Sequence, residues 1–191
     1  MALPPPRWRT VIVVAAILAL VALSAGSINA LPFFSDDTGP TDIEVVSLER
    51  LDAGCEDDVG DYVSSRNGPN GTYEVTSFIE TGSVDADLGA YAERTSQDGA
   101  DFSTFRVYVE SYRDGPANET CDVGIQYRLE VQTSGGTDGG LLPDASGVRV
   151  LFLENGRYSG CSGGGSGPYA DTGCDRFMMQ TPTRTWANAT G

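Results

Sequence analysis

The stretch from Cys121 to Gln132, CDVGIQYRLEVQ, alternates between apolar and polar or small residues over its whole length. A period of two sends successive side chains to opposite faces of a β-strand, so one face is expected to be buried and the other to meet water. Segments 72–80 (TYEVTSFIE) and 103–112 (STFRVYVESY) repeat this pattern. Each such strand must cover its apolar face with another layer, which predicts an all-β domain.

Other segments fit the same fold class. Asn155-Gly156 predicts a hairpin with a type I′ turn, because both central positions of that turn need positive φ. A slip in the alternation between Val45 and Val46 predicts a bulge. About seven strands without a βαβ rhythm predict an antiparallel, immunoglobulin-like β-sandwich. The remaining strands are expected at 43–51, 147–160 (both arms of the hairpin) and 176–181, and short helices at 56–63 and 85–94.

The N-terminal part of the chain contains an apolar run from Val11 to Leu31. Twenty helical residues span the roughly 30 Å of a bilayer core. Arg7 and Arg9 precede the run and acidic residues follow it, which predicts a cytoplasmic N-terminus and an outer C-terminal part. The predicted division is a cytoplasmic N-terminus (1–10), a transmembrane anchor (11–31), a linker (32–42) and an extracellular β-sandwich domain (43–191).

A cleaved signal peptide is the alternative interpretation of the same run. Ile28-Asn29-Ala30 offers a small-residue cleavage site, and the product would be a secreted domain. The length of the run and the aromatic residues at its ends, Trp8 and Phe33, favour an uncleaved single-pass anchor in the cell membrane. The lipid bilayer is therefore an expected partner of the N-terminal segment.

The chain is strongly acidic, and its basic residues are of a single type. Its 12 basic residues are all Arg, 27 residues are acidic, and the net charge is −15. Scattered carboxylates repel one another in dilute buffer and are tolerated when molar salt shortens the screening length to about 3 Å. In composition the chain resembles the proteins of extremely halophilic archaea. The negative charge argues against binding to nucleic acid, which requires basic patches.

The absence of both His and Lys excludes several kinds of catalysis. Ser-His-Asp triads, His-ligated metals, Schiff bases and Ser-Lys dyads all require one of these residues. A pair of carboxylates could still support a hydrolase, which is the least favoured alternative. Asp171-Thr172-Gly173 resembles an aspartic-protease motif but lies beside Cys174 in a Gly-rich stretch. We therefore expect no catalytic residue, metal or cofactor.

Four cysteines, Cys55, Cys121, Cys161 and Cys174, predict two disulfides in an exported domain. The Gly-rich stretch CSGGGSGPYADTGC, residues 161–174, has neither the Lys of a phosphate loop nor the close ligand pairs of a zinc site. It is predicted to be a turn closed by a Cys161–Cys174 bridge, which would contribute about 3 kcal/mol in the chain-entropy model. Cys55 then pairs with Cys121.

Three sequons place glycosylation sites at Asn70, Asn118 and Asn188, each in a predicted turn or near the chain end. Such positions outside strands are those at which a glycan can be attached. The sequence therefore predicts that at least one of these asparagines is modified.

These features predict a membrane-anchored, non-catalytic β-domain at the cell surface that binds a protein of a surface layer or a membrane complex. The alternative is a filament subunit. An N-terminal apolar helix followed by a β-rich head is similar in plan to archaeal pilins and archaellins, in which a peptidase cuts between a basic and a small residue before the helix. Arg9-Thr10 is the corresponding position here, although Thr10 departs from that pattern.

Overall fold

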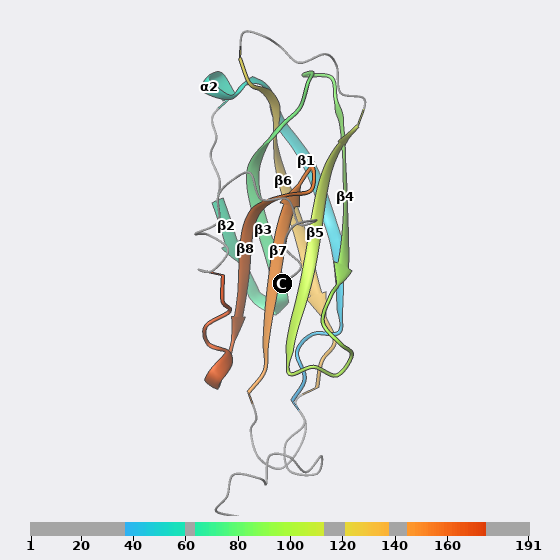
Figure 1. Ribbon diagram of the computed structural model, residues 1–191, viewed down its shortest axis with the longest axis vertical. Helices are drawn as coiled ribbons and strands as arrows, with labels where there is room; N and C mark the ends of the chain where they lie inside the picture. The colour runs from blue at the N-terminus through green and yellow to red at the C-terminus, as the bar shows by residue number, and fades with distance from the viewer. Residues whose placement is uncertain (1–36, 60–63, 113–120, 138–144, 175–191) are drawn as a thin grey trace, which may run out of the picture. The chain divides into compact units, whose positions relative to one another are not determined.

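The computed structural model describes residues 37–59, 64–112, 121–137 and 145–174 (Figure 1). The predicted membrane segment (11–31) and the predicted strand 176–181 lie outside these residues. Among the described residues, none belongs to a helix that is both long and apolar enough to span a bilayer.

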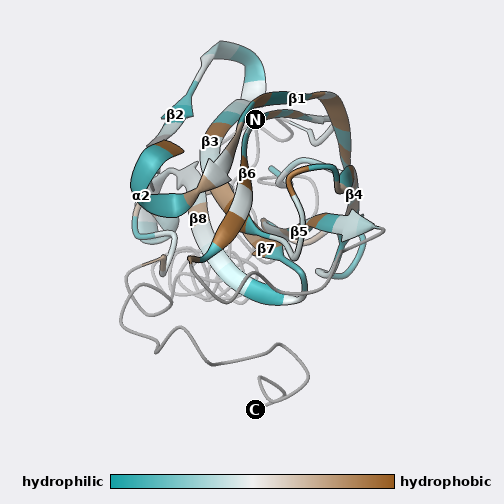
Figure 2. Cartoon of the chain, turned by 90° about the horizontal axis from the view of Figure 1, so that it is seen from above, coloured by the Kyte–Doolittle hydropathy of each residue, from teal (hydrophilic) through white to brown (hydrophobic). Residues whose placement is uncertain are grey.

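The described residues form an all-β sandwich of two four-stranded sheets. The first sheet has the order β1-β6-β3-β2 and the second the order β4-β5-β7-β8. Figure 2 looks along the strands and shows β1, β6 and β3 on one side and β4, β5, β7 and β8 on the other. The strands are β1 (Asp42–Cys55), β2 (Ser64–Asn67), β3 (Thr72–Glu80), β4 (Asp87–Arg94), β5 (Phe102–Tyr112), β6 (Val123–Ser134), β7 (Gly147–Glu154) and β8 (Arg157–Gly165).

The core lies between the sheets and consists of the residues that the period-two pattern assigns to one face. On β6, the alternate residues from Ile125 to Val131 are fully buried, and on β5 those from Phe105 to Val109. Residues of β3 and β7 complete the cluster. The predicted burial of these strand faces is confirmed. The other strongly buried core residues include Tyr73, Val75, Ile79, Val150 and Phe152.

The β5–β7 pair departs from the predicted antiparallel arrangement. These neighbouring strands are parallel, whereas the other strand pairs are antiparallel. The strand between them in sequence, β6, belongs to the opposite sheet. The chain therefore crosses the sandwich, runs back along the first sheet, and returns beside β5 in the same direction as before.

The predicted helix at 85–94 is wrong, because most of this segment forms strand β4. Leu88, Ala90 and Ala92 pack against the core, and the residues between them face outward. A helix-like spacing of apolar residues was available in the sequence, but pairing with β5 decides the conformation. The helix predicted at 56–63 is a single turn at Glu56–Val59, and its remainder lies beyond the described residues.

Two local predictions are confirmed. The β1–β6 register shifts between Val45 and Ser47, so that Val46 bulges outward with 49% of its surface exposed. Asn155 and Gly156 connect β7 to β8 with φ angles of 46° and 75°, as a type I′ turn requires.

Polar contacts join the two sheets along both sides. On one side Arg50 of β1 donates to the carbonyl groups of Val84 and Ala86, just before β4. On the other side Asn67 of β2 donates to Gly163 O of β8 at 3.2 Å and accepts a bond from Ser162. These contacts hold the edge strands of the two sheets together and limit the free backbone that edge strands would offer to other chains.

Candidate functional site

The two disulfides have the predicted pairing. Cys55 at the end of β1 is bonded to Cys121, just before β6, with 5.7 Å between their Cα atoms. Cys161 in β8 is bonded to Cys174, with a Cα separation of 5.5 Å. The first bridge ties two neighbouring strands of one sheet, and the second holds the end of the described chain against β8.

Residues 161–174 are more regular than a turn, which corrects the sequence interpretation. The first five continue strand β8 to Gly165, and a 3₁₀ turn follows at Gly167–Tyr169. The Tyr169 ring packs against Phe102 at 5.4 Å. The Asp171 carboxylate accepts a hydrogen bond from Gly173 N at 2.8 Å and so forms an Asx turn. This bond gives Asp171 a structural role in the turn.

The first sequon lies in an accessible place. Asn70 is exposed and occupies a 3₁₀ turn at Pro69–Gly71 with φ of 58°. Thr133 donates to the carbonyl of Gly71 at 3.1 Å, so β6 fixes the turn from beneath. Asn118 and Asn188 lie outside the described residues.

A cluster of tyrosines and glutamates covers the outer face of β4 and β5. We call Tyr91, Tyr108, Tyr112, Glu93 and Glu110 the tyrosine surface. The β4–β5 register alternates residues between the core and this face, so all five side chains project away from the other sheet. Tyr91 and Tyr112 keep 46% and 47% of their surface exposed, which is unusual for such large side chains within a strand pair.

The rings of the tyrosine surface are held in place. Tyr91 and Tyr108 lie directly opposite one another on the two strands and stack at 4.6 Å with an interplanar angle of 11°. Tyr112 lies close over the backbone of Gly89, where an added Cβ would stand 2.7 Å from a ring carbon. Glycine at this position therefore makes room for the ring.

Each of the three hydroxyl groups donates to a carboxylate. Tyr91 and Tyr112 donate to the two oxygens of Glu110, at 3.3 and 3.1 Å. Tyr108 donates to Glu93 at 2.7 Å.

Loss of solvent and the neighbouring carboxylates raise the pKa values of all three tyrosines. Loss of solvent is the main cause for Tyr91 and Tyr108, whereas the bond to Glu110 is the main cause for Tyr112. All three hydroxyls therefore keep their protons at neutral pH.

A second tyrosine–glutamate pair joins the two sheets, with the tyrosine fully buried and the glutamate partly exposed. Tyr127 of β6 donates to Glu154 of β7 at 2.6 Å, which joins the two sheets. Ser159 donates to the same carboxylate oxygen at 2.8 Å. Burial raises the pKa of Glu154, and burial together with this carboxylate raises the pKa of Tyr127 well above its usual range.

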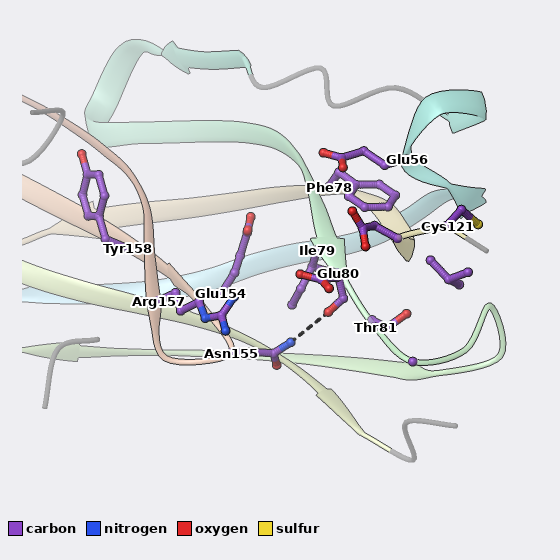
Figure 3. Close-up of a pocket in the computed structure, with 13 residues that line it drawn as sticks. Glu56, Phe78, Ile79, Glu80, Thr81, Cys121, Glu154, Asn155, Arg157 and Tyr158 are labelled. Carbon is purple, nitrogen blue, oxygen red and sulfur yellow. Dashed lines mark hydrogen bonds between the residues drawn. The ribbon is translucent and has the colours of Figure 1, made fainter. Parts of the chain in front are cut away.

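A pocket of about 610 Å³ opens beside this pair (Figure 3). Glu56 and Phe78 lie at one side of it, and Arg157, Glu154 and Tyr158 lie at the other. A carboxyl group with a raised pKa can serve as a general acid. One oxygen of Glu154, however, already accepts bonds from Tyr127 and Ser159, which fits a role in joining the sheets. Within the described ranges no group of three or more Cys, Asp or Glu residues is arranged to hold a metal ion.

The tyrosine surface was not among the residues that the sequence singled out. Tyr108, Glu110 and Tyr112 occupy the predicted water-facing positions of segment 103–112, so outward-facing aromatic residues were a usable signal. Tyr91 was missed because its segment was expected to be helical.

Comparison with known proteins gives no further assignment. No family model matches the chain, and neither curated proteins nor solved structures contain a match.

Proposed function

We propose that this chain is a membrane-anchored, non-catalytic binding module of the cell surface, and that the tyrosine surface contacts its partner. The apolar run 11–31 serves as the anchor, and the disulfide-bonded sandwich carries the contact residues. The partner is a protein of a surface layer or of a membrane complex.

The observation that carries this proposal is the exposure of two ordered tyrosine rings on a rigid sheet. Tyrosine is enriched in protein interfaces and in their energetic hot spots. Tyr91 and Tyr112 are both bonded to Glu110, and Tyr91 is also stacked on Tyr108. Much of the conformational entropy that binding would remove is therefore already lost in the free protein, which favours association.

The finer fold assignment, an immunoglobulin-like sandwich, is part of this proposal. It is supported by the two four-stranded sheets and by three connections that cross between them, β3–β4, β5–β6 and β6–β7. The parallel β5–β7 pair departs from a purely antiparallel plan.

Adaptation to high salt and glycosylation are also proposed. The charge of −15 leads us to expect a melting temperature that climbs steeply between about 0.1 and 2 M KCl as screening tightens. A flat profile would contradict the salt adaptation. The exposure of Asn70 supports its modification, which intact-glycopeptide mass spectrometry would detect as added mass on residues 65–72.

The anchor is tested by adding protease to intact cells that express the full chain. The outer domain should be degraded while the N-terminus stays protected. Recovery of the domain in the medium, starting near Leu31, would indicate a signal peptide. A mature N-terminus next to Thr10 would favour the filament subunit instead.

The contact surface is tested by photo-cross-linking in the same cells. A photoreactive phenylalanine analogue replaces Tyr91 in one variant and Arg66 in another. Arg66 is an exposed residue of β2 in the opposite sheet and serves as the matched control. We expect a discrete higher-mass adduct from position 91 alone. Equal adducts from both positions, or none from either, would overturn the assignment of the tyrosine surface.

A further inference from the structure

The tyrosine surface uses its O–H donors in internal hydrogen bonds. The groups that it can offer to a partner are therefore hydrogen-bond acceptors. A phenol has a single O–H, and those of Tyr91, Tyr108 and Tyr112 are all directed at carboxylates. An ionised carboxylate has about four lone-pair sites and no hydrogen to donate. Glu110 receives one tyrosine bond on each oxygen and so retains room for further donors. A complementary group must therefore bring N–H or O–H donors.

The charge of the tyrosine surface indicates whether the donor of the partner is charged or neutral. Among the described residues Glu110 has no ion-pair partner, while Arg106 lies beside Glu93 and Tyr108 at the other end of the surface. The Glu110 end is thus negative, and it is the end that carries Tyr112. A cation is favoured there over a neutral donor such as a sugar hydroxyl.

The arrangement of the rings favours a guanidinium over an ammonium group. One face of the Tyr91 ring is covered by Tyr108. Tyr108 belongs to β5, so the other face of the Tyr91 ring is turned away from β5; β4 is an edge strand, and Tyr91 is 46% exposed. A planar guanidinium stacks on such a ring and still donates sideways to a carboxylate, whereas an ammonium group acts as a compact, strongly hydrated point charge.

From these observations, and resting on the proposed function, we infer that the tyrosine surface binds an arginine side chain of a partner protein. The guanidinium stacks on the outward face of Tyr91 or Tyr112 and donates to the carboxylate of Glu110. All 12 basic residues of this chain are Arg, so a partner of similar composition would also present arginine as its cation.

The test uses the full chain in a non-ionic detergent with carbon-13 in its tyrosine rings, titrated by NMR. The probe is acetyl-Gly-Arg-Gly-amide, and the comparison peptides carry citrulline, a neutral isostere of arginine, or lysine. About 2 M KCl screens long-range charge and leaves contact interactions. We expect the ring signals of Tyr91 and Tyr112 to shift with the arginine peptide. Binding should be at least about fivefold weaker for citrulline and also weaker for lysine.

Two variants that each remove one negative charge distinguish a local contact with Glu110 from an effect of net charge. Glu110→Gln should weaken arginine binding by about fivefold or more, because it removes the negative partner of the guanidinium. Glu44→Gln, at an exposed position of β1 in the other sheet, should leave binding unchanged. Unchanged positions of the core methyl signals would show that both variants are folded.

The inference is overturned by equal shifts with arginine and citrulline, by equal affinity of the Glu110→Gln and Glu44→Gln variants, or by methyl mannoside shifting these rings while the arginine peptide does not. Its failure is distinguishable from that of the proposed function. A position-91 cross-link on cells without arginine binding would keep the contact surface and reject only the guanidinium as its ligand.

Discussion

Tyrosine hydroxyls donate to glutamate carboxylates in two regions of this protein, one inside the sandwich and one on its outer face. Inside, Tyr127 is fully buried and its bond to Glu154 joins the two sheets. Outside, Tyr91 and Tyr112 share Glu110 and remain about half exposed.

The difference between the two regions lies in their surroundings, since the bonded groups are the same. The Tyr127 hydroxyl is buried and would be costly to leave unpaired, so it depends on the partly buried Glu154 carboxylate. On the surface, water can replace either partner, and the bonds mainly hold the rings in place. We therefore expect the inner pair to matter for stability and the outer group for binding.

The largest expected contrast is between truncations of the two kinds of ring. Tyr127→Ala should lower the free energy of unfolding by about 4 kcal/mol, because it leaves a cavity between the sheets. Tyr112→Ala should leave it nearly unchanged, since that ring is half exposed. Guanidinium chloride unfolding followed by circular dichroism would measure both. Comparable losses of unfolding free energy in the two variants would contradict the distinction between a stabilising inner pair and an outer group that serves binding.

Removal of the hydroxyl alone gives the next largest contrast. Tyr127→Phe keeps the ring but deprives Glu154 of a donor, which should cost about 1–3 kcal/mol. Tyr112→Phe should have little effect, because water can bond to Glu110 in its place. The same unfolding experiment applies. A Tyr127→Phe variant as stable as the wild type would show that Ser159 satisfies Glu154 without the tyrosine.

The pH dependence of stability tests the inner carboxylate. Because the pKa of Glu154 is raised on folding, its contribution is fully present below the usual pKa of glutamate and is lost as pH rises through the folded value. Glu154→Gln, neutral at every pH, should remove this decline. Denaturant unfolding between about pH 4 and 8 would show a flatter profile than in the wild type. Glu44→Gln, which changes an exposed acid, should keep the wild-type slope.

The smallest expected effect concerns the tyrosine pKa values of the outer surface. The bond to Glu110 is the main cause of the raised pKa of Tyr112, whereas loss of solvent is the main cause for Tyr91. Because the bond from Tyr112 to Glu110 is also the shorter of the two, at 3.1 against 3.3 Å, Glu110→Gln should lower the pKa of Tyr112 more than that of Tyr91. NMR titration of labelled rings would resolve the two. Equal displacement would mean that the carboxylate acts on both in the same way.

The sequence by itself determined which faces of most strands are buried, because a period of two is a local property of the chain. The alternate residues from Val123 to Val131 and from Phe105 to Val109 are buried as their pattern predicts. The Asn155-Gly156 turn and the bulge beside Val45 are also local, since they depend on residues adjacent in the chain. The cysteine pairing was predicted by placing Cys161 after the hairpin and Cys174 before the expected strand 176–181, and the two bridges have that pairing.

Only the tertiary structure decided the rest. Segment 85–94 supports a helical and an extended spacing alike, and β5 is what selects the strand. The parallel β5–β7 pair depends on β6 joining the opposite sheet. Tyr127 meets Glu154 only through sheet packing, and Tyr91 meets Glu110 only through strand register, whereas Tyr112 bonds to Glu110 two residues away on the same strand. A local pattern sets the face to which a side chain points, but its partner is set by the strand that packs beside it.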